Sequence, residues 1–150
     1  MKSLVIYDST FGNTKIIAET ISQNLGNDSL VLSISEINEI NYQDFDLIIV
    51  GSPIIGWRPT IKMQEFLSKL QPNSLKGISA TSFDTRVKLF IHGDAANKIA
   101  TKLTHLGASI ITKPHPFYVK GKDQETHLLD GEIEKAKQWS KQIIELIPEK

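Results

Sequence analysis

A cluster of hydroxyl and amide side chains lies in one short turn near the start of the chain, Ser9-Thr10-Phe11-Gly12-Asn13-Thr14. The turn follows the apolar run Leu4-Val5-Ile6 and precedes a helical pattern, so it connects a strand directly to a helix. Helix N-termini present unpaired N–H groups and the positive end of the helix dipole, and both stabilise a bound anion. We therefore expect this turn to hold one phosphate group through Ser9, Thr10, Asn13 and Thr14.

Two common phosphate motifs are excluded by the same residues. A Walker loop ends in Gly-Lys-Ser/Thr, whereas Lys15 follows Thr14 with no glycine before it. The dinucleotide fingerprint needs three spaced glycines, and Gly12 is the single glycine of this turn. The simpler alternative is an ordinary strand-to-helix turn that binds nothing.

Composition predicts one globular domain over residues 1–150, with 40% hydrophobic and 23% charged residues. The chain has no cysteine, so it has no disulfide, thiol nucleophile or thiolate metal site, and redox chemistry would require a cofactor. Its four histidines share no metal-ligand spacing, and no residue has a persuasive setting as a general acid or base. We therefore expect no metal site and no catalytic residue.

The charge is unevenly distributed although the formal net charge is zero. Residues 1–56 carry two basic and seven acidic side chains, whereas residues 58–122 carry eleven basic and three acidic ones. The basic residues are dispersed and lack interleaved aromatic residues, which argues against a nucleic-acid partner. No apolar run approaches eighteen residues and no signal-peptide layout precedes the first strand, so we expect a cytoplasmic protein with no membrane partner.

Apolar runs of strand type alternate with segments of helical period along the chain, which indicates a parallel sheet with crossover helices. We predict an α/β fold with a doubly wound, five-stranded parallel sheet in the order 2-1-3-4-5. Trp139 lies on the apolar stripe of the last helix and is expected in the core. The predicted strands are 3–7, 29–34, 46–51, 78–83 and a broken edge strand at 109–111 and 117–119; the predicted helices are about 13–25, 60–70, 94–106 and 133–147.

In such a sheet, ligands bind outside the carboxyl ends of the strands where the strand order reverses. Here the ends of strands 1, 3 and 4 carry the phosphate turn, a loop over 51–59 and the segment 82–86. Trp57 lies on the Gly/Pro-rich loop, where an aromatic face can stack on a planar ring. Together, these segments predict a planar ligand with one phosphate.

The turn resembles the FMN-phosphate motif of flavodoxins, Thr/Ser-x-Thr-Gly-x-Thr, at Ser9, Gly12 and Thr14, with Phe11 in place of the middle threonine. Gly51-Ser52-Pro53 resembles the start of the loop that flanks the flavin in that family, and Phe83-Asp84-Thr85-Arg86 and Phe117-Tyr118-Val119-Lys120-Gly121 resemble segments of short-chain members. The resemblance implies the flavodoxin-like fold and an FMN cofactor. The cofactor-binding residues that it implies are Ser9, Thr10, Phe11, Gly12, Asn13, Thr14, Pro53, Ile54, Ile55, Gly56, Trp57, Phe83, Asp84, Thr85 and Arg86.

The resemblance implies an electron carrier that shuttles electrons between redox partner proteins, as a monomer or weak homo-oligomer. Two alternatives stay open: an NAD(P)H-dependent flavin or quinone reductase, and an interaction module that has lost FMN. Arg58 and Arg86 occur on the two segments that should border the flavin ring. We expect the charge of Arg86 to make the fully reduced cofactor easier to form.

Overall fold

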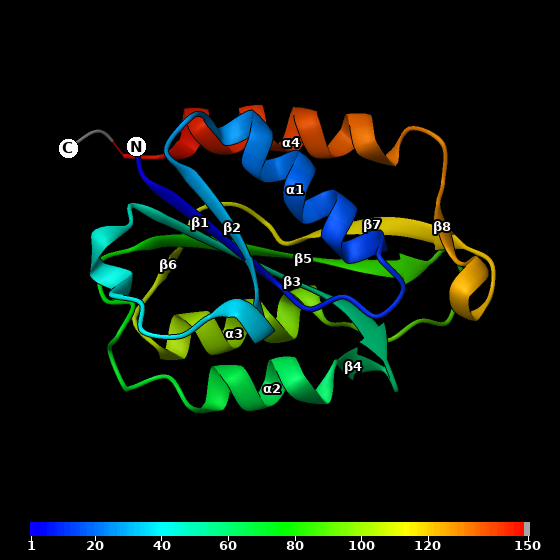
Figure 1. Ribbon diagram of the computed structural model, residues 1–150, viewed down its shortest axis with the longest axis horizontal. Coiled ribbons are helices and arrows are strands. Elements are labelled where there is room, and N and C mark those ends of the chain that lie inside the picture. The colour runs from blue at the N-terminus through cyan, green and yellow to red at the C-terminus, as the bar shows by residue number, and fades with distance from the viewer. Residues whose placement is uncertain (149–150) are drawn as a thin grey trace.

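The computed structural model describes residues 1–148, in which eight strands form one twisted sheet in the order β2-β1-β3-β5-β7-β8 (Figure 1). All neighbours on this path are parallel except β7 and β8, while β4 pairs antiparallel with β3 and β6 pairs parallel with β5. The strands are β1 Ser3–Tyr7, β2 Ser29–Ser33, β3 Leu47–Ile55, β4 Arg58–Pro59, β5 Ser79–Val87, β6 Ser109–Ile110, β7 His115–Lys120 and β8 His127–Leu128.

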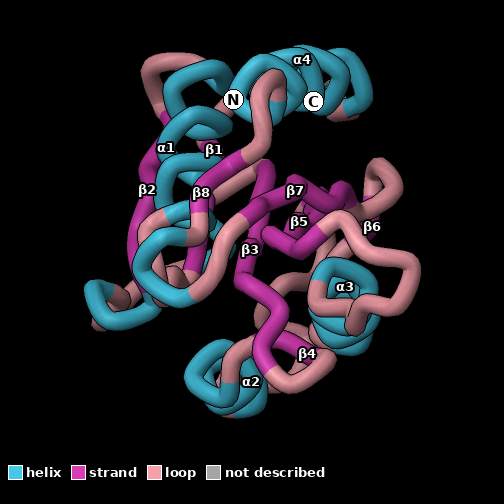
Figure 2. The backbone as a smooth tube through the Cα atoms, turned by 90° about the vertical axis from the view of Figure 1, so that its right-hand side faces the viewer, coloured by secondary structure: helices cyan, strands magenta, loops and turns pink. Residues whose placement is uncertain are grey.

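The α-helices cover the sheet in two layers, with α1 and α4 on one face and α2 and α3 on the other (Figures 1 and 2). Their bounds are α1 Asn13–Leu25, α2 Ile61–Ser68, α3 Ala96–His105 and α4 Glu132–Leu146; short 3-10 turns occupy Ile34–Glu36, Tyr42–Asp44 and Asp123–Glu125.

Alternating side chains of the central strands build a separate core on each face. Leu4 and Ile6 of β1 pack in the core beneath α2 and α3, whereas Val5 of the same strand packs toward α1 and α4. Trp139 of α4 is 3% exposed and belongs to the second core, as the helical stripe predicts.

The sheet confirms the predicted fold class and the order of its central strands, but it has eight strands instead of five, and several predicted ends were wrong. β3 and β5 each continue about four residues past the predicted carboxyl end, and β7 begins before Phe117. Residues 83–87 of β5 continue as a strand because β7 pairs with them in register, from Phe83↔His115 to Val87↔Val119. The predicted edge position of this last segment was also wrong, since β8 pairs with β7 on its outer side.

The expected loop over 51–59 is instead the end of β3 and a tight hairpin into β4. Ile55 pairs with Arg58, so Gly56 and Trp57 form a two-residue turn. Both have positive φ, 60° and 74°, which matches the right-handed twist of a hairpin. Positive φ is rare for a bulky side chain such as Trp57, so this turn is held by contacts beyond its own backbone preference.

Gly51 marks the point where β3 crosses the aromatic core. A Cβ built on Gly51 would lie 2.1 Å from Cζ of Phe83, its neighbour on β5. The Phe83 ring has no exposed surface and makes edge-on contacts with Phe117 at 5.9 Å and Trp139 at 6.4 Å between centroids. Gly51 is therefore required by packing, and Phe83 is a core residue.

The amino ends of the strands lie at the opposite end of the sheet from the β3–β4 hairpin (Figure 1). There Met1 and Pro148 line one hollow together with Asp46 and Ser79, which precede and begin β3 and β5. The two ends of the described chain thus meet at one end of the molecule.

Candidate functional site

A cavity of about 430 Å³ opens at the carboxyl ends of the central strands, in the crevice that the topology predicts. Its volume falls within the range of small-molecule sites. The turn before α1 supplies one side of the cavity, the β3–β4 hairpin a second, and the end of β5 with residues 87–93 a third.

The turn before α1 offers unused hydrogen-bond donors. Ser9 Oγ accepts the N–H of Gly12 at 3.1 Å, and Ser9 N–H donates to Asp8 Oδ1 at 3.0 Å. Within residues 1–148, the N–H groups of residues 10, 11, 13 and 14 have no hydrogen-bond partner. Four free donors at a helix N-terminus form a ready site for an anion.

The carboxylate of Asp8 holds this turn through hydrogen bonds. Its Oδ2 accepts the hydroxyl of Thr60 at 2.5 Å, and Thr60 Oγ1 in turn accepts the N–H of Met63 as the cap of α2. The carboxylate thus satisfies the N–H of Ser9 and a hydroxyl of the neighbouring layer, and it links the phosphate turn to α2.

The two polar side chains at the start of α1 are held by distant segments. Thr14 is buried, and its Oγ1 lies 2.9 Å from Oγ1 of Thr85 on β5. One of these hydroxyls donates to the other, so the pair keeps one hydroxyl proton for a ligand. Asn13 Nδ2 donates to the carbonyl oxygen of Thr126 at 2.9 Å, which ties the turn to the β7–β8 connection.

Gly93 allows the second and third walls to touch. A Cβ on Gly93 would lie 2.2 Å from Cα of Trp57, and the N–H of Asp94 donates to the Trp57 carbonyl at 3.0 Å. The hairpin tip is therefore fixed against the segment that leads into α3.

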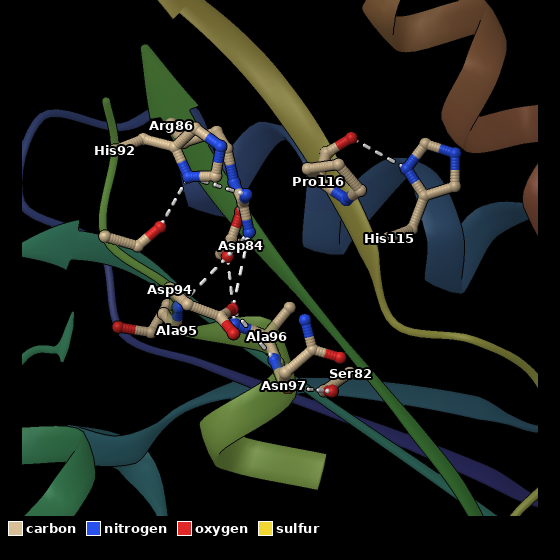
Figure 3. Close-up of polar contacts among 12 residues, drawn as sticks. Ser82, Asp84, Arg86, His92, Asp94, Ala95, Ala96, Asn97, His115 and Pro116 are labelled. Carbon is tan, nitrogen blue, oxygen red and sulfur yellow. Dashed lines mark hydrogen bonds and ion pairs between the residues drawn. The ribbon is translucent and has the colours of Figure 1, made fainter. Parts of the chain in front are cut away.

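A buried ion pair anchors the third wall (Figure 3). Asp84 has no exposed surface; its two oxygens accept Nε of Arg86 at 2.9 Å and Nη2 at 2.6 Å. Asp84 Oδ2 also accepts the N–H groups of Ala95 and Ala96 at 3.2 and 2.9 Å, at the start of α3. The carboxylate thus forms a bidentate salt bridge with Arg86 of β5 and accepts two N–H groups at the start of α3, which joins the two elements.

Arg86 lines the cavity, and the carboxylate of Asp84 neutralises its positive charge. Besides Asp84, its Nη2 lies 3.4 Å from Asp94 Oδ1, and Nη1 lies 3.1 Å from His92 Nδ1. The hydrogen bond to Asp84 raises the pKa of Arg86, although burial opposes the shift. The expectation that Arg86 brings a net positive charge to the ring is corrected accordingly, because Asp84 neutralises it.

The Flavodoxin domain family matches residues 4–122. The chain belongs to this family. A curated flavodoxin from Maridesulfovibrio salexigens is 26% identical over 120 residues, covering 73% of this chain and 81% of that protein.

Solved flavodoxins have the same fold. A flavodoxin from the domain Archaea superposes with a TM-score of 0.81 at 24% identity, covering 98% of this chain and 99% of that one. Oxidised flavodoxin 1 from Bacillus cereus gives 0.79 at 20% identity, with 99% and 100% covered. Family membership makes the chain an FMN-binding electron-transfer flavoprotein.

The flavodoxin cavity fits a flavin with one phosphate. The free N–H groups before α1 suit the phosphate, and no acidic side chain lines the cavity within residues 1–148. Apolar and aromatic side chains of the hairpin, such as Ile54 and Trp57, suit a flat ring. Lys15 does not line the cavity, and its Nζ lies 3.9 Å from Oε1 of Glu19.

Most residues that sequence reasoning assigned to this flavodoxin site line the cavity: Thr10, Phe11, Asn13, Thr14, Pro53, Ile54, Ile55, Gly56, Trp57, Thr85 and Arg86. Ser9 and Gly12 do not line it, but they shape the turn, where Gly12 has φ 95°. Phe83 and Asp84 are the other two predicted residues, and neither lines the cavity. Phe83 points into the aromatic core, and Asp84 points toward Arg86 and α3.

Sequence reasoning missed the segment after β5, of which Leu89, Ile91, His92 and Gly93 line the cavity. The apolar run Leu89-Phe90-Ile91 could have indicated this segment, because it lies outside every predicted helix and strand. The side chains of these three residues are all largely exposed.

No group of three or more histidine, aspartate or glutamate side chains within residues 1–148 could hold a metal ion. No helix in this part of the chain is long and apolar enough to cross a membrane.

Proposed function

We propose that this flavodoxin binds one FMN in the cavity at the carboxyl ends of β1, β3 and β5 and carries electrons between redox partner proteins. The observation that supports it is the combination, in one cavity, of free N–H donors before α1 with an apolar hairpin wall. Bound FMN supplies the redox chemistry, because the chain has no cysteine to provide it.

The residues of the chain have separate roles in this proposal. The N–H groups of residues 10, 11, 13 and 14, with the Thr14–Thr85 hydroxyl pair, hold the phosphate. Trp57 and Ile55 cover the ring and exclude water from part of it, while the Asp84–Arg86 pair keeps the third wall in place without adding net charge. The exposed hairpin tip leaves one side of the cavity open to a partner.

The phosphate assignment is tested by comparing FMN with riboflavin. A charge-assisted hydrogen bond contributes roughly 1.5 to 3 kcal/mol, so Thr14→Ala should weaken FMN by about ten- to a hundredfold. Flavin fluorescence quenching measures both affinities, and riboflavin binding should be weak and insensitive to Thr14→Ala. Equal affinity for FMN and riboflavin would refute the phosphate site.

The role as a carrier is tested with NADPH. The FMN-loaded protein should oxidise NADPH no faster than free FMN does in the same buffer, with a quinone as the final acceptor. Sustained turnover above that rate would instead identify a reductase.

A further inference from the structure

Exposed apolar side chains surround the opening of the cavity. Phe90 is fully exposed, Leu89 and Ile91 beside it are about two-thirds exposed, and Trp57 is 59% exposed. We define the mouth patch as Phe11, Ile55, Trp57, Leu89, Phe90 and Ile91; all but Phe90 line the cavity itself. Apolar side chains gathered in this way on three neighbouring segments indicate a surface that another molecule covers.

A second hollow, of about 450 Å³, lies between α2 and α3 and carries only positive charge. Arg58, Lys98 and Lys102 line it together with apolar residues such as Leu67 and Ile99. No carboxylate lines this groove, and none of the three cations has an ion-pair partner within residues 1–148. The groove therefore attracts negative charge.

The hairpin joins these two features into one surface. Gly56 and Trp57 line the cavity, and the next two residues, Arg58 and Pro59, line the groove. Figure 2 shows β4 beside α2 and α3. Residues 53–62 and 85–93 contain no acidic residue, while they carry Arg58, Lys62 and Lys88 in addition to the neutralised Arg86.

We propose that the mouth patch and the α2–α3 groove form one docking surface for redox proteins whose contact face is apolar with an acidic rim. The proposal rests on the proposed function, because docking at the cavity mouth brings a partner's redox centre close to FMN. Opposite charges at the rim speed encounter, and apolar contact at the centre holds the complex. A concave groove admits protruding acidic side chains of a protein, whereas a flat membrane surface cannot enter it.

One acceptor in two charge forms tests the sign of this surface. Native cytochrome c is basic, and succinylation converts its lysine amines to carboxylates while the haem stays in place. The FMN-loaded protein is reduced with dithionite, freed of excess reductant and mixed with each ferric form. Two electrons leave the reduced FMN, two haem Fe³⁺ become Fe²⁺, the FMN returns to its oxidised state and its released protons go to water.

We expect the rate with succinylated cytochrome c to fall at least about tenfold between 10 and 500 mM NaCl, because salt screens attraction. The rate with native cytochrome c should stay flat or rise. Lys98→Glu/Lys102→Glu should remove most of the salt dependence with the succinylated form. The matched control is Lys137→Glu/Lys141→Glu, which has the same spacing and charge change on α4, on the other face of the sheet, and should behave as wild type.

Phe90→Ser tests the apolar part, since Phe90 does not line the cavity. It should lower the rate with the succinylated form at least about threefold at high salt, where contact outweighs attraction, and leave FMN affinity unchanged. Leu146→Ser, an exposed apolar change near the end of α4, is the control.

The flavin absorbance before mixing reports FMN binding separately, so its absence would count against the proposed function alone. Calorimetric titration with succinylated cytochrome c measures docking directly, whether or not the protein holds FMN. It should show binding in the wild type and none in Lys98→Glu/Lys102→Glu. Faster reaction and tighter binding with native cytochrome c would overturn the docking surface, as would equal behaviour of the two lysine pairs. Salt-sensitive sedimentation with phosphatidylglycerol vesicles, without binding to the succinylated protein, would assign the patch to a membrane instead.

Discussion

The carbonyl oxygen of Trp57 accepts a 3.0 Å hydrogen bond from the N–H of Asp94, so the tip of one hairpin is fastened to the start of the next structural layer. The contact gives the positive φ of Trp57 a physical support, because the rare backbone conformation aims its carbonyl at a donor outside the turn. It also links two walls of the cavity directly.

Gly93→Ala tests this coupling. The added Cβ would lie 2.2 Å from the Trp57 backbone, and such overpacking costs roughly 1 to 3 kcal/mol. We expect FMN to bind about tenfold more weakly, measured by fluorescence titration, because the hairpin must shift. Gly131→Ala is the control, since it strains a glycine of φ 87° at the start of α4 but meets no neighbour. Unchanged FMN affinity in Gly93→Ala would show that the walls adjust independently.

Gly51→Ala should destabilise the fold rather than the site. Its Cβ would collide with the Phe83 ring, which is locked between Phe117 and Trp139, so we expect a loss of about 3 kcal/mol in the free energy of unfolding. Urea unfolding measures the loss. Adding Phe83→Leu should recover part of it by opening space. If the double variant loses the sum of the two single losses in free energy of unfolding, the added Cβ does not clash with the Phe83 ring.

The Asp84–Arg86 pair predicts a strongly non-additive result. Asp84→Asn leaves the largely buried guanidinium of Arg86 with only the longer ion pair to Asp94, and breaking a buried pair in this way costs about 3 to 5 kcal/mol. Asp84→Asn/Arg86→Gln should be more stable to urea than Asp84→Asn alone, because neither charge is then stranded. A double variant less stable than Asp84→Asn would contradict this prediction, because Arg86 would then stabilise the fold without Asp84.

His115 predicts a pH-dependent stability. Burial against Phe117 and Trp139 lowers the pKa of His115 below 6.5, despite a backbone contact that opposes the shift. The unfolded chain then binds the proton more tightly, so the contribution is present above pH 6.5 and is lost as pH falls below it. His115→Gln should flatten this part of the slope in urea unfolding between pH 5 and 8. An identical slope in both proteins would mean that His115 titrates alike in the two states.

The sequence predicted the parts of the fold that follow from local pattern. Strict apolar runs located β1 and the buried half of β3, and the Gly12 turn located the start of α1. The length of β5 could not be read locally, because residues 84–87 form a strand by pairing with β7, about thirty residues further along the chain, and at residues 84 and 85 also with the end of β3.

For the site, the same limit explains why two predicted residues do not line the cavity. Phe83 and Asp84 occur at the carboxyl end of a strand, where a ligand contact is a fair prediction, but alternation turns the Phe83 ring toward α4 and the Asp84 carboxylate toward α3. Within the turn, Ser9 contacts N–H groups within six positions of the chain, which local sequence can indicate. The contacts of Asn13 and Thr14 with Thr126 and Thr85 are long-range and could not be read in this way.

The hollow that Met1 and Pro148 share has a practical consequence for attaching this molecule to a surface. Both ends of the described chain emerge at the amino ends of the strands, the full length of the sheet away from the cavity mouth. A thiol or biotin handle introduced at Met1 would therefore anchor every molecule on an electrode with its cavity mouth turned toward the solution. Electrons would have to cross the long axis of the sheet to reach the electrode. A layer of molecules attached in this way would therefore report electron exchange with dissolved partners rather than direct exchange with the electrode.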